Sequence, residues 1–210
     1  MRTQETAARI GALAVVVLAL TLAAMHAVQP DLDPMRHYVS EYAYGPFGGW
    51  LQVGYVVAAA GALLLALSVA AWLPGPRWTA IVAASLVLVA VGLAATGLTR
   101  IDVPVDGNVS TTSGTFHELA GYVAILGLLV GGFGLAAALG RADRDRLAGV
   151  AWRYAGIVVV AVVATIVLQR LDLVGLGQRI FLAVALSWLV WVGMQAGGRT
   201  EQAEPRAVRS

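Results

Sequence analysis

Six long apolar runs divide the chain, and a more polar break follows each of the first five. A helix that spans a bilayer needs about 20 mostly apolar residues, and all six runs are close to that length or above it. The runs comprise residues 8–28, 49–73, 78–98, 117–139, 150–168 and 178–195. This pattern predicts an all-α fold, namely a six-helix transmembrane bundle.

The breaks between the runs carry residues that end helices. Pro-Gly-Pro at 74–76 is typical of a tight turn, residues 141–146 form a short charged loop, and Val-Asp-Gly-Asn at 105–108 is rich in residues that tolerate positive φ. The first run is long for the apolar core of a signal peptide, and a poor cleavage site follows it. We therefore interpret it as a helix of the bundle.

Composition agrees with a membrane location. The chain of 210 residues is 59% hydrophobic and only 12% charged, whereas soluble domains carry about twice that share of charge. A bilayer is needed to cover the surplus apolar surface, and the 24 glycines favour close approach of helices. We expect one transmembrane domain, residues 1–196, followed by a disordered cytoplasmic tail, residues 197–210.

The distribution of arginine predicts the orientation. All fourteen basic residues are arginines; ten lie at the N-terminus, in the second and fourth breaks and in the tail, and four lie in the other three breaks. Because cytoplasmic loops are enriched in basic residues, both termini are expected in the cytoplasm of a multi-pass protein of the cell membrane. The arginines are dispersed, which argues against a nucleic-acid partner.

Two short matches indicate a weak internal repeat. Leu-Thr-Arg-Ile-Asp at 98–102 closes the third run, and Leu-Gln-Arg-Leu-Asp at 168–172 closes the fifth. Gly-Tyr-Val recurs at 54–56 and 121–123. These spacings favour three helix hairpins in the same orientation, and chance similarity between apolar segments is the alternative.

Polar and titratable residues that could take part in catalysis or binding gather on the predicted outer face, where all three histidines lie. The first outer loop, residues 31–50, is longer than the 2–8 residues that usually connect packed helices, so we expect it to fold over the bundle as a lid or pocket wall. Candidates for acid–base catalysis are Asp102, His117 and His37. Candidates for substrate binding are Arg36, Arg100, Asp33, Ser40 and Glu41.

Each candidate also has a purely structural interpretation. His37 and His117 could simply make local hydrogen bonds, and Asp102 could pair only with Arg100. Thr115-Phe-His-Glu118 fits a capping box, in which Glu118 would reach back to the amide of Thr115. Against these alternatives, we expect Arg36 and His37 to approach Asp102 and His117 in one pocket, with Arg36 and Asp102 as the natural ion pair.

Metal and cofactor chemistry receives little support. The chain contains no cysteine, which excludes disulfides, thiol nucleophiles and cysteine-based metal sites. A zinc or iron site would need His37, His117 and Asp102 or Asp33 to converge from separate loops. A bis-histidine haem would need His26 to face His117. We predict no metal site and identify no cofactor.

The two outer loops together carry a family resemblance. The stretches "DPMRHYVSEYAYGPFGGWLQVGYV" and "LTRIDVP…STTSGTFHELAGYVA" resemble the DUF998 family of six-helix bacterial membrane proteins. The family pattern D-P-x-R-x-x-x-S-x-x-G falls on Asp33 to Ser40, although Gly45 comes two residues late. The rest of the pattern falls on Asp102, Thr111, Gly114 and His117. Members often have a second histidine shortly before the one matching His117, where this chain has threonine and serine. The resemblance implies the fold and draws attention to the outer face, but it implies no reaction.

Two classes of function follow. The first is an enzyme that acts on a lipid or isoprenoid-like substrate at the outer leaflet. The second is a non-catalytic membrane protein that binds a lipid or a partner protein. An ion-coupled transporter is disfavoured because none of the six runs has a charged residue at mid-membrane depth. Membrane lipids are the expected partners, and no oligomeric state is predicted.

Overall fold

The structure is a computed structural model that describes residues 2–73, 75–102 and 111–198. Within these ranges the chain forms six long α-helices and one short 3-10 helix, with no strand. The helices are α1 (Arg2–Val28), η1 (Val39–Tyr44), α2 (Gly48–Val69), α3 (Pro76–Leu98), α4 (Thr112–Gly140), α5 (Asp145–Arg170) and α6 (Val174–Gly197). The prediction of an all-α protein with six spanning helices is confirmed.

The outer surface of the helices is strongly apolar. All six α-helices are long and apolar enough to cross a membrane. Side chains such as Leu20 on α1, Leu67 on α2 and Val160 on α5 are about two-thirds exposed. Exposure of so much apolar surface to water would be unfavourable, so these faces belong against lipid. The protein is therefore a multi-pass membrane protein.

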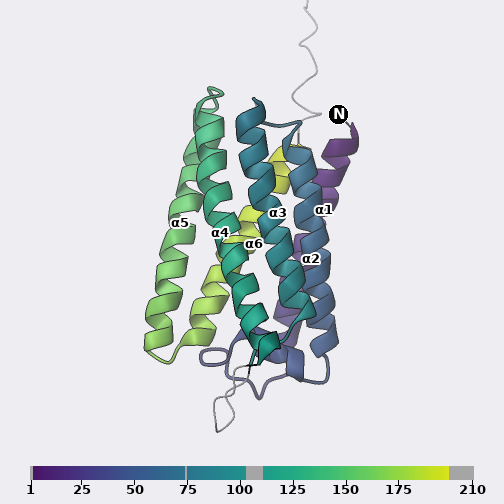
Figure 1. Ribbon diagram of the computed structural model, residues 1–210, viewed down its shortest axis with the longest axis vertical. Helices are drawn as coiled ribbons and strands as arrows, with labels where there is room; N and C mark the ends of the chain where they lie inside the picture. The colour runs from purple at the N-terminus through teal and green to yellow at the C-terminus, as the bar shows by residue number, and fades with distance from the viewer. Residues whose placement is uncertain (1, 74, 103–110, 199–210) are drawn as a thin grey trace, which may run out of the picture.

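The helices pack in chain order around a ring. Each α-helix lies against the next, and α6 returns to pack against α1 and closes the ring (Figure 1). Glycine permits the closest of these contacts. A Cβ atom added at Gly127 of α4 would lie 2.6 Å from the carbonyl oxygen of Ser85 on α3, and one added at Gly92 of α3 would lie 2.6 Å from the carbonyl oxygen of Ala120. The inference that glycine allows close helix approach is confirmed for this pair.

The two ends of the bundle differ in character. One end, which we call the histidine end, carries residues 29–47, 99–102 and 171–173 together with the adjoining ends of the helices. All three histidines lie at this end. It is the end drawn lowest in Figure 1, and the sequence predicts that it faces the outside of the cell.

The opposite end, which we call the terminal end, brings the first and last helices together. The Nε atom of Arg9 donates a hydrogen bond of 3.1 Å to the carbonyl oxygen of Gly197. The α2–α3 and α4–α5 turns lie at the same end (Figure 1). Its placement in the cytoplasm is a prediction from the arginine distribution. Most of the predicted tail, residues 199–210, lies outside the described residues.

Several helices begin before their predicted starts, and at α4 the hydrogen bonds show the reason. This helix begins at Thr112, five residues before the predicted start, because the hydroxyl of Thr111 accepts a hydrogen bond from the amide of Gly114 and caps the helix. The predicted capping box of Thr115 and Glu118 is therefore wrong. Glu118 lies in the second turn of α4 and is exposed.

Candidate functional site

Residues 29–47 fold over the histidine end and are partly buried there. The 3-10 helix η1 contributes five consecutive buried residues, 39–43. Tyr42 is fully buried, and Glu41 is only 8% exposed. The prediction that this loop folds back over the bundle is confirmed.

Arg179 of α6 holds this segment in place. Its Nε atom donates to Nε2 of His26 at 2.7 Å, and one terminal nitrogen donates to the carbonyl oxygen of His37 at 2.8 Å. The other terminal nitrogen donates to the hydroxyl of Tyr42 at 3.1 Å. The Nδ1 atom of His26 lies 2.6 Å from the carbonyl oxygen of Leu22. Because a carbonyl only accepts, His26 carries its proton on Nδ1 and accepts from Arg179 at Nε2.

Two neighbours of Arg179 complete the attachment of the segment to α6. The side-chain oxygen of Gln178 accepts a hydrogen bond from the amide of Val39 at 2.6 Å. Gly175 lies directly under the loop, since an added Cβ atom would be 2.4 Å from the carbonyl oxygen of His37 and 2.5 Å from that of Pro34. Only glycine permits so close an approach of the two backbones.

Within this segment, the side chains of His37 and Glu41 are in hydrogen-bond contact across one turn. The Nδ1 atom of His37 lies 2.9 Å from Oε2 of Glu41. The second carboxylate oxygen of Glu41 accepts a hydrogen bond from the amide of Tyr38 at 2.8 Å. The carboxylate is therefore buried and fixed, whereas the imidazole side chain is 41% exposed. A partly exposed base that a buried carboxylate orients suits proton transfer.

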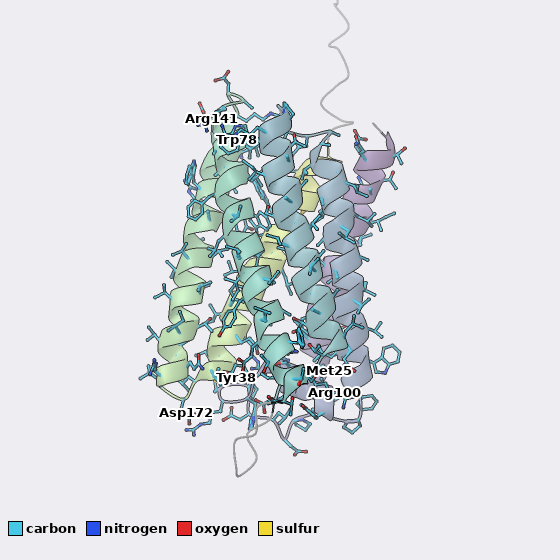
Figure 2. All side chains as sticks on the ribbon, in the orientation of Figure 1. Met25, Tyr38, Trp78, Arg100, Arg141 and Asp172 are labelled. Atoms are coloured by element: carbon cyan, nitrogen blue, oxygen red, sulfur yellow. The ribbon has the colours of Figure 1, made fainter. Side chains whose placement is uncertain are left out.

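Tyr38 adds a second titratable group beside this pair. Burial raises the pKa of the Tyr38 phenol above its usual value, and the carboxylates of Glu118 and Glu41 and the phenol of Tyr122 raise it further. The phenol therefore stays protonated at neutral pH and is available as a hydrogen-bond donor. Figure 2 places Tyr38 at the same end of the bundle as Arg100 and Asp172.

The Asp102 carboxylate accepts hydrogen bonds that stabilise the second loop. Its two carboxylate oxygens accept hydrogen bonds from the amide of Thr111 at 2.8 Å and from its hydroxyl at 2.5 Å. These bonds lower the pKa of Asp102. Gly114 lies against the carboxylate, because an added Cβ atom would be 2.0 Å from Oδ2. Asp102 therefore braces the residue that caps α4.

Arg36 does not pair with Asp102, so that prediction is wrong. Its guanidinium lies 3.1 Å from Asp172, at the start of the α5–α6 turn, and 3.8 Å from Asp33. Asp33 also accepts a hydrogen bond from the amide of Met35 at 2.9 Å. These groups are exposed, so the pairs contribute little to stability.

The two large loops nevertheless meet, through Tyr44 and Arg100. The hydroxyl of Tyr44 donates a hydrogen bond to the carbonyl oxygen of Ile101. The guanidinium of Arg100 lies 5.6 Å from the centroid of the Tyr44 ring, within reach of a cation–π contact. Among the described residues, Arg100 forms no ion pair, so its charge is open to an anionic ligand.

His117 lies deeper than the other candidates. It is 8% exposed, and its Nδ1 atom is 3.4 Å from the hydroxyl of Thr99. Among the described residues, neither a hydrogen bond nor an ion pair joins His117 to His37. Ser40 is buried, and its hydroxyl has no hydrogen-bond partner in the described part of the chain.

The sequence candidates thus separate into a loop group and a helix group. In the loop group, His37 and Arg100 remain candidates for catalysis or binding, and the buried Glu41 contacts His37. In the helix group, Asp102 stabilises the start of α4 and His117 is enclosed. No group of three histidine or carboxylate side chains that could hold a metal ion occurs within the described residues. Sequence reasoning gave no role to Tyr38 and left Arg179 unassigned. The signal for Arg179 was a single cation near the start of an apolar run.

Comparison with known proteins agrees with this architecture. Neither the curated proteins nor the solved structures yield a match to the chain. A family model described as "Protein of unknown function (DUF998)" matches residues 12–195, which include α2 to α5 and most of α1 and α6. The chain therefore belongs to the DUF998 family, and its six candidate membrane spans are those of this family's domain.

Proposed function

We propose that this protein is a membrane enzyme that carries out acid–base chemistry on the headgroup of a lipid or isoprenoid-like substrate at the histidine end. The observation that carries the proposal is the His37–Glu41 pair, in which a buried carboxylate orients an imidazole that is 41% exposed. His37 accepts the proton, and Glu41 holds the ring in position. Such a positioned base contributes about a hundredfold to ten-thousandfold to a reaction rate.

Two further groups supply complementary chemistry. Arg100 is held against Tyr44 with its charge open, which suits a phosphate or another anionic headgroup. The phenol of Tyr38, whose pKa is raised by burial, stays protonated and suits donation of a hydrogen bond to the reacting group.

The surroundings favour a substrate that arrives from the bilayer. Tyr44, Phe47 and Trp50 are 50%, 46% and 70% exposed, respectively, beside the ends of the spanning helices. Aromatic side chains in this position suit the headgroup region of a membrane. These exposed rings suit contact with a lipid-like molecule that lies in the leaflet.

The alternative is a non-catalytic protein that binds a lipid or a partner at this face. One observation favours it: much of the polarity at the histidine end already serves the fold. Arg179 uses its donors on His26, His37 and Tyr42, and Asp102 uses both oxygens on Thr111. Binding would then depend on Arg100 and not on His37.

Lipid turnover tests the proposal. The purified full chain is placed in nanodiscs made from total lipid of the source cells, and lipid species are followed by mass spectrometry over time. His37→Gln keeps a polar side chain but removes the base, so turnover should fall at least about a hundredfold. Glu41→Gln should cause a smaller loss, about tenfold to a hundredfold, because the ring stays in place but loses its charged partner.

The matched control is Asp31→Asn, an exposed position in the same segment, which should leave turnover unchanged. Turnover that is insensitive to His37→Gln would contradict the assignment of the base. If the wild-type protein converts no lipid but retains a lipid that Arg100→Gln releases, the non-catalytic alternative is correct.

A further inference from the structure

A lipid-facing groove lies near the terminal end, far from the histidine end. It runs between α3, α4 and α5 and has a volume of about 470 Å³. Its walls are apolar and rich in aromatic rings, and the lining includes Trp78, Ile81, Leu129, Phe133, Ala137 and Trp152. The rings of Phe133 and Trp152 meet edge to face at 5.7 Å and form one side of the groove.

Two arginines lie at the mouth of this groove. The guanidinium of Arg141 is 4.7 Å from the centroid of the Trp78 ring, and that of Arg77 is 5.9 Å from the same ring. Figure 2 shows Trp78 and Arg141 side by side at the terminal end. Both cations are therefore gathered on one aromatic ring at the point where the groove opens toward the headgroup region.

In the part of the chain that the structure describes, neither arginine forms an ion pair. Arg141 donates one hydrogen bond of 3.3 Å to the carbonyl oxygen of Ala137 in its own helix. Asp143 follows in the α4–α5 turn and Asp145 begins α5, but within the described residues no carboxylate comes within 4.0 Å of either guanidinium. Most of the donors on Arg77 and Arg141 are available to a ligand, and an anion is the complementary charge.

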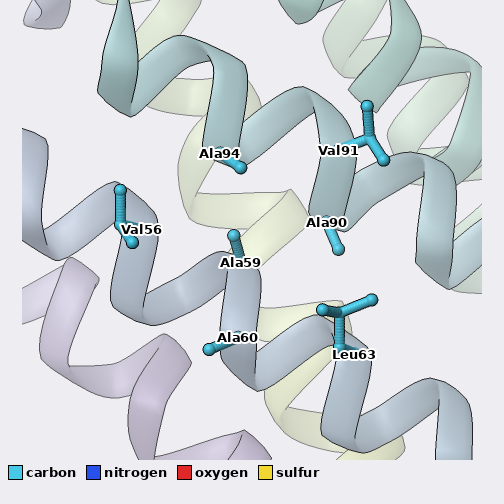
Figure 3. Close-up of a pocket in the computed structure, with 7 residues that line it drawn as sticks. All are labelled: Val56, Ala59, Ala60, Leu63, Ala90, Val91 and Ala94. Atoms are coloured by element: carbon cyan, nitrogen blue, oxygen red, sulfur yellow. The ribbon is translucent and has the colours of Figure 1, made fainter.

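A second groove provides a useful contrast. It lies between α2 and α3, with a volume of about 280 Å³, and is lined by valine, leucine and alanine alone, including Val56, Leu63 and Ala90 (Figure 3). Neither groove has a charged residue in its lining, but two guanidinium groups lie against Trp78, which lines the first groove. Nothing in the second groove selects one apolar occupant over another, whereas the groove below Trp78 combines an apolar trough with a cationic mouth.

We propose that the Trp78 groove binds an anionic phospholipid from the leaflet at the terminal end. The phosphate lies between Arg77 and Arg141, and an acyl chain runs down the trough past Ile81 and Phe133. The order of the two features along the helices, cations at the rim and apolar walls below, matches the order of headgroup and chain in a phospholipid. A partner helix would fill the trough but would leave the two cations without a counter-charge.

Native mass spectrometry of the delipidated full chain tests this proposal. Phosphatidylglycerol and phosphatidylcholine with the same acyl chains are titrated in parallel, and phosphatidylglycerol should bind more tightly. An arginine near a membrane surface contributes about 1 kcal/mol to attraction of anionic lipid. The double variant Arg77→Gln/Arg141→Gln should therefore weaken phosphatidylglycerol binding about thirtyfold and weaken phosphatidylcholine binding much less, because the choline cation already offsets the charge of its phosphate.

Two more variants keep the outcome decisive. Arg146→Gln removes the same charge from an exposed position in the same region and should change binding less than about twofold. Ala137→Leu fills the trough while keeping both arginines, and it should also weaken phosphatidylglycerol binding; thermal melting of each variant confirms folding. Any one of three results would overturn the proposal: the two lipids bind equally, Arg146→Gln has as large an effect as the double variant, or Ala137→Leu binds phosphatidylglycerol normally.

Discussion

Replacement of Arg179 is expected to release the loop that covers the histidine end. Arg179→Met keeps a side chain of similar length in the helix but removes every hydrogen-bond donor. Three bonds that link α6 to other parts of the chain are lost, namely those to Nε2 of His26, the carbonyl oxygen of His37 and the hydroxyl of Tyr42. The fourth bond, to Gly175, lies within α6 and adds little to the attachment.

The size of the effect follows from these three bonds. A hydrogen bond from a charged donor contributes about 1.5–3 kcal/mol, and the lower value applies because Arg179 is partly exposed. Since bonds that share one side chain are not additive, the loss should be about 3–4 kcal/mol. For a domain of this size, each 1 kcal/mol corresponds to about 2–4 °C in Tm. The Tm of the variant in detergent should therefore fall by about 10 °C.

Two comparison variants separate the loss of the Arg179 hydrogen bonds from the loss of a positive charge. Arg179→Lys keeps the charge but concentrates its donors on one nitrogen, so it should recover less than half of the lost stability. Arg170→Gln removes an exposed arginine at the end of α5 and should change the Tm by less than about 2 °C. Hydrogen exchange should accelerate in residues 29–47 of Arg179→Met, with α3 and α4 unaffected. If Arg179→Met melts like Arg170→Gln, or if exchange rises equally in all helices, the assignment of Arg179 as the anchor is wrong.

Two further predictions concern orientation and acid stability. Because the chain has no cysteine, a single introduced cysteine can report which side of the membrane a residue faces. Met35 is 42% exposed, so Met35→Cys should react with a membrane-impermeant maleimide in intact cells, whereas Thr3→Cys should react only after lysis. The reverse pattern would show that the histidine end faces the cytoplasm. Thr111 lowers the pKa of Asp102, so this carboxylate stabilises the fold above its unfolded-state pKa near 4, and the contribution is lost as pH falls through the lower folded-state value. The Asp102→Asn variant should therefore lose less Tm than the wild type between pH 5 and pH 3, and parallel losses would contradict the role of Asp102.

The fold could be predicted because each helix is specified by its own stretch of sequence. A long apolar run needs no distant partner to be recognised as a spanning helix, so all six helices were found. The ends were less certain because they depend on contacts across loops. The start of α4 is fixed by Thr111, which Asp102 in turn braces from nine residues away. The pattern of apolar and polar residues does not predict the contact between Asp102 and Thr111.

The candidate site could be predicted only in part, for the same reason. His37 and Glu41 are four residues apart, and their contact is local. The partner of Arg36 is Asp172, which reaches it because α6 closes the ring against α1. The sequence offered Asp102 instead, since the family pattern marks both loops. Ring closure also brings Arg179 under the first loop, and nothing in the pattern of apolar runs specifies which helices meet at the closure.

The two Arg-x-Asp matches illustrate how far a repeat in sequence can be followed into structure. Asp102 accepts from Thr111, and Asp172 accepts from Arg36, so neither aspartate pairs with the arginine two residues before it. Asp172 adopts a positive φ of 60°. The three-hairpin repeat stays a prediction, and the matching residues Asp102 and Asp172 have different hydrogen-bond partners.

The polarity of residues 29–47 follows mainly from their backbone. Apart from η1 this segment is irregular, and its amides and carbonyls at a membrane boundary need partners that a regular helix would supply internally. Side chains supply them: Gln178 accepts from Val39, Arg179 donates to the carbonyl oxygen of His37, and Glu41 accepts from Tyr38. These contacts account for most of the charged and amide groups around the loop. The exposed side of His37 and the guanidinium of Arg100 are not accounted for in this way within the described residues. Because structural demands explain their neighbours but not these two groups, a function at the histidine end is best sought in His37 and Arg100.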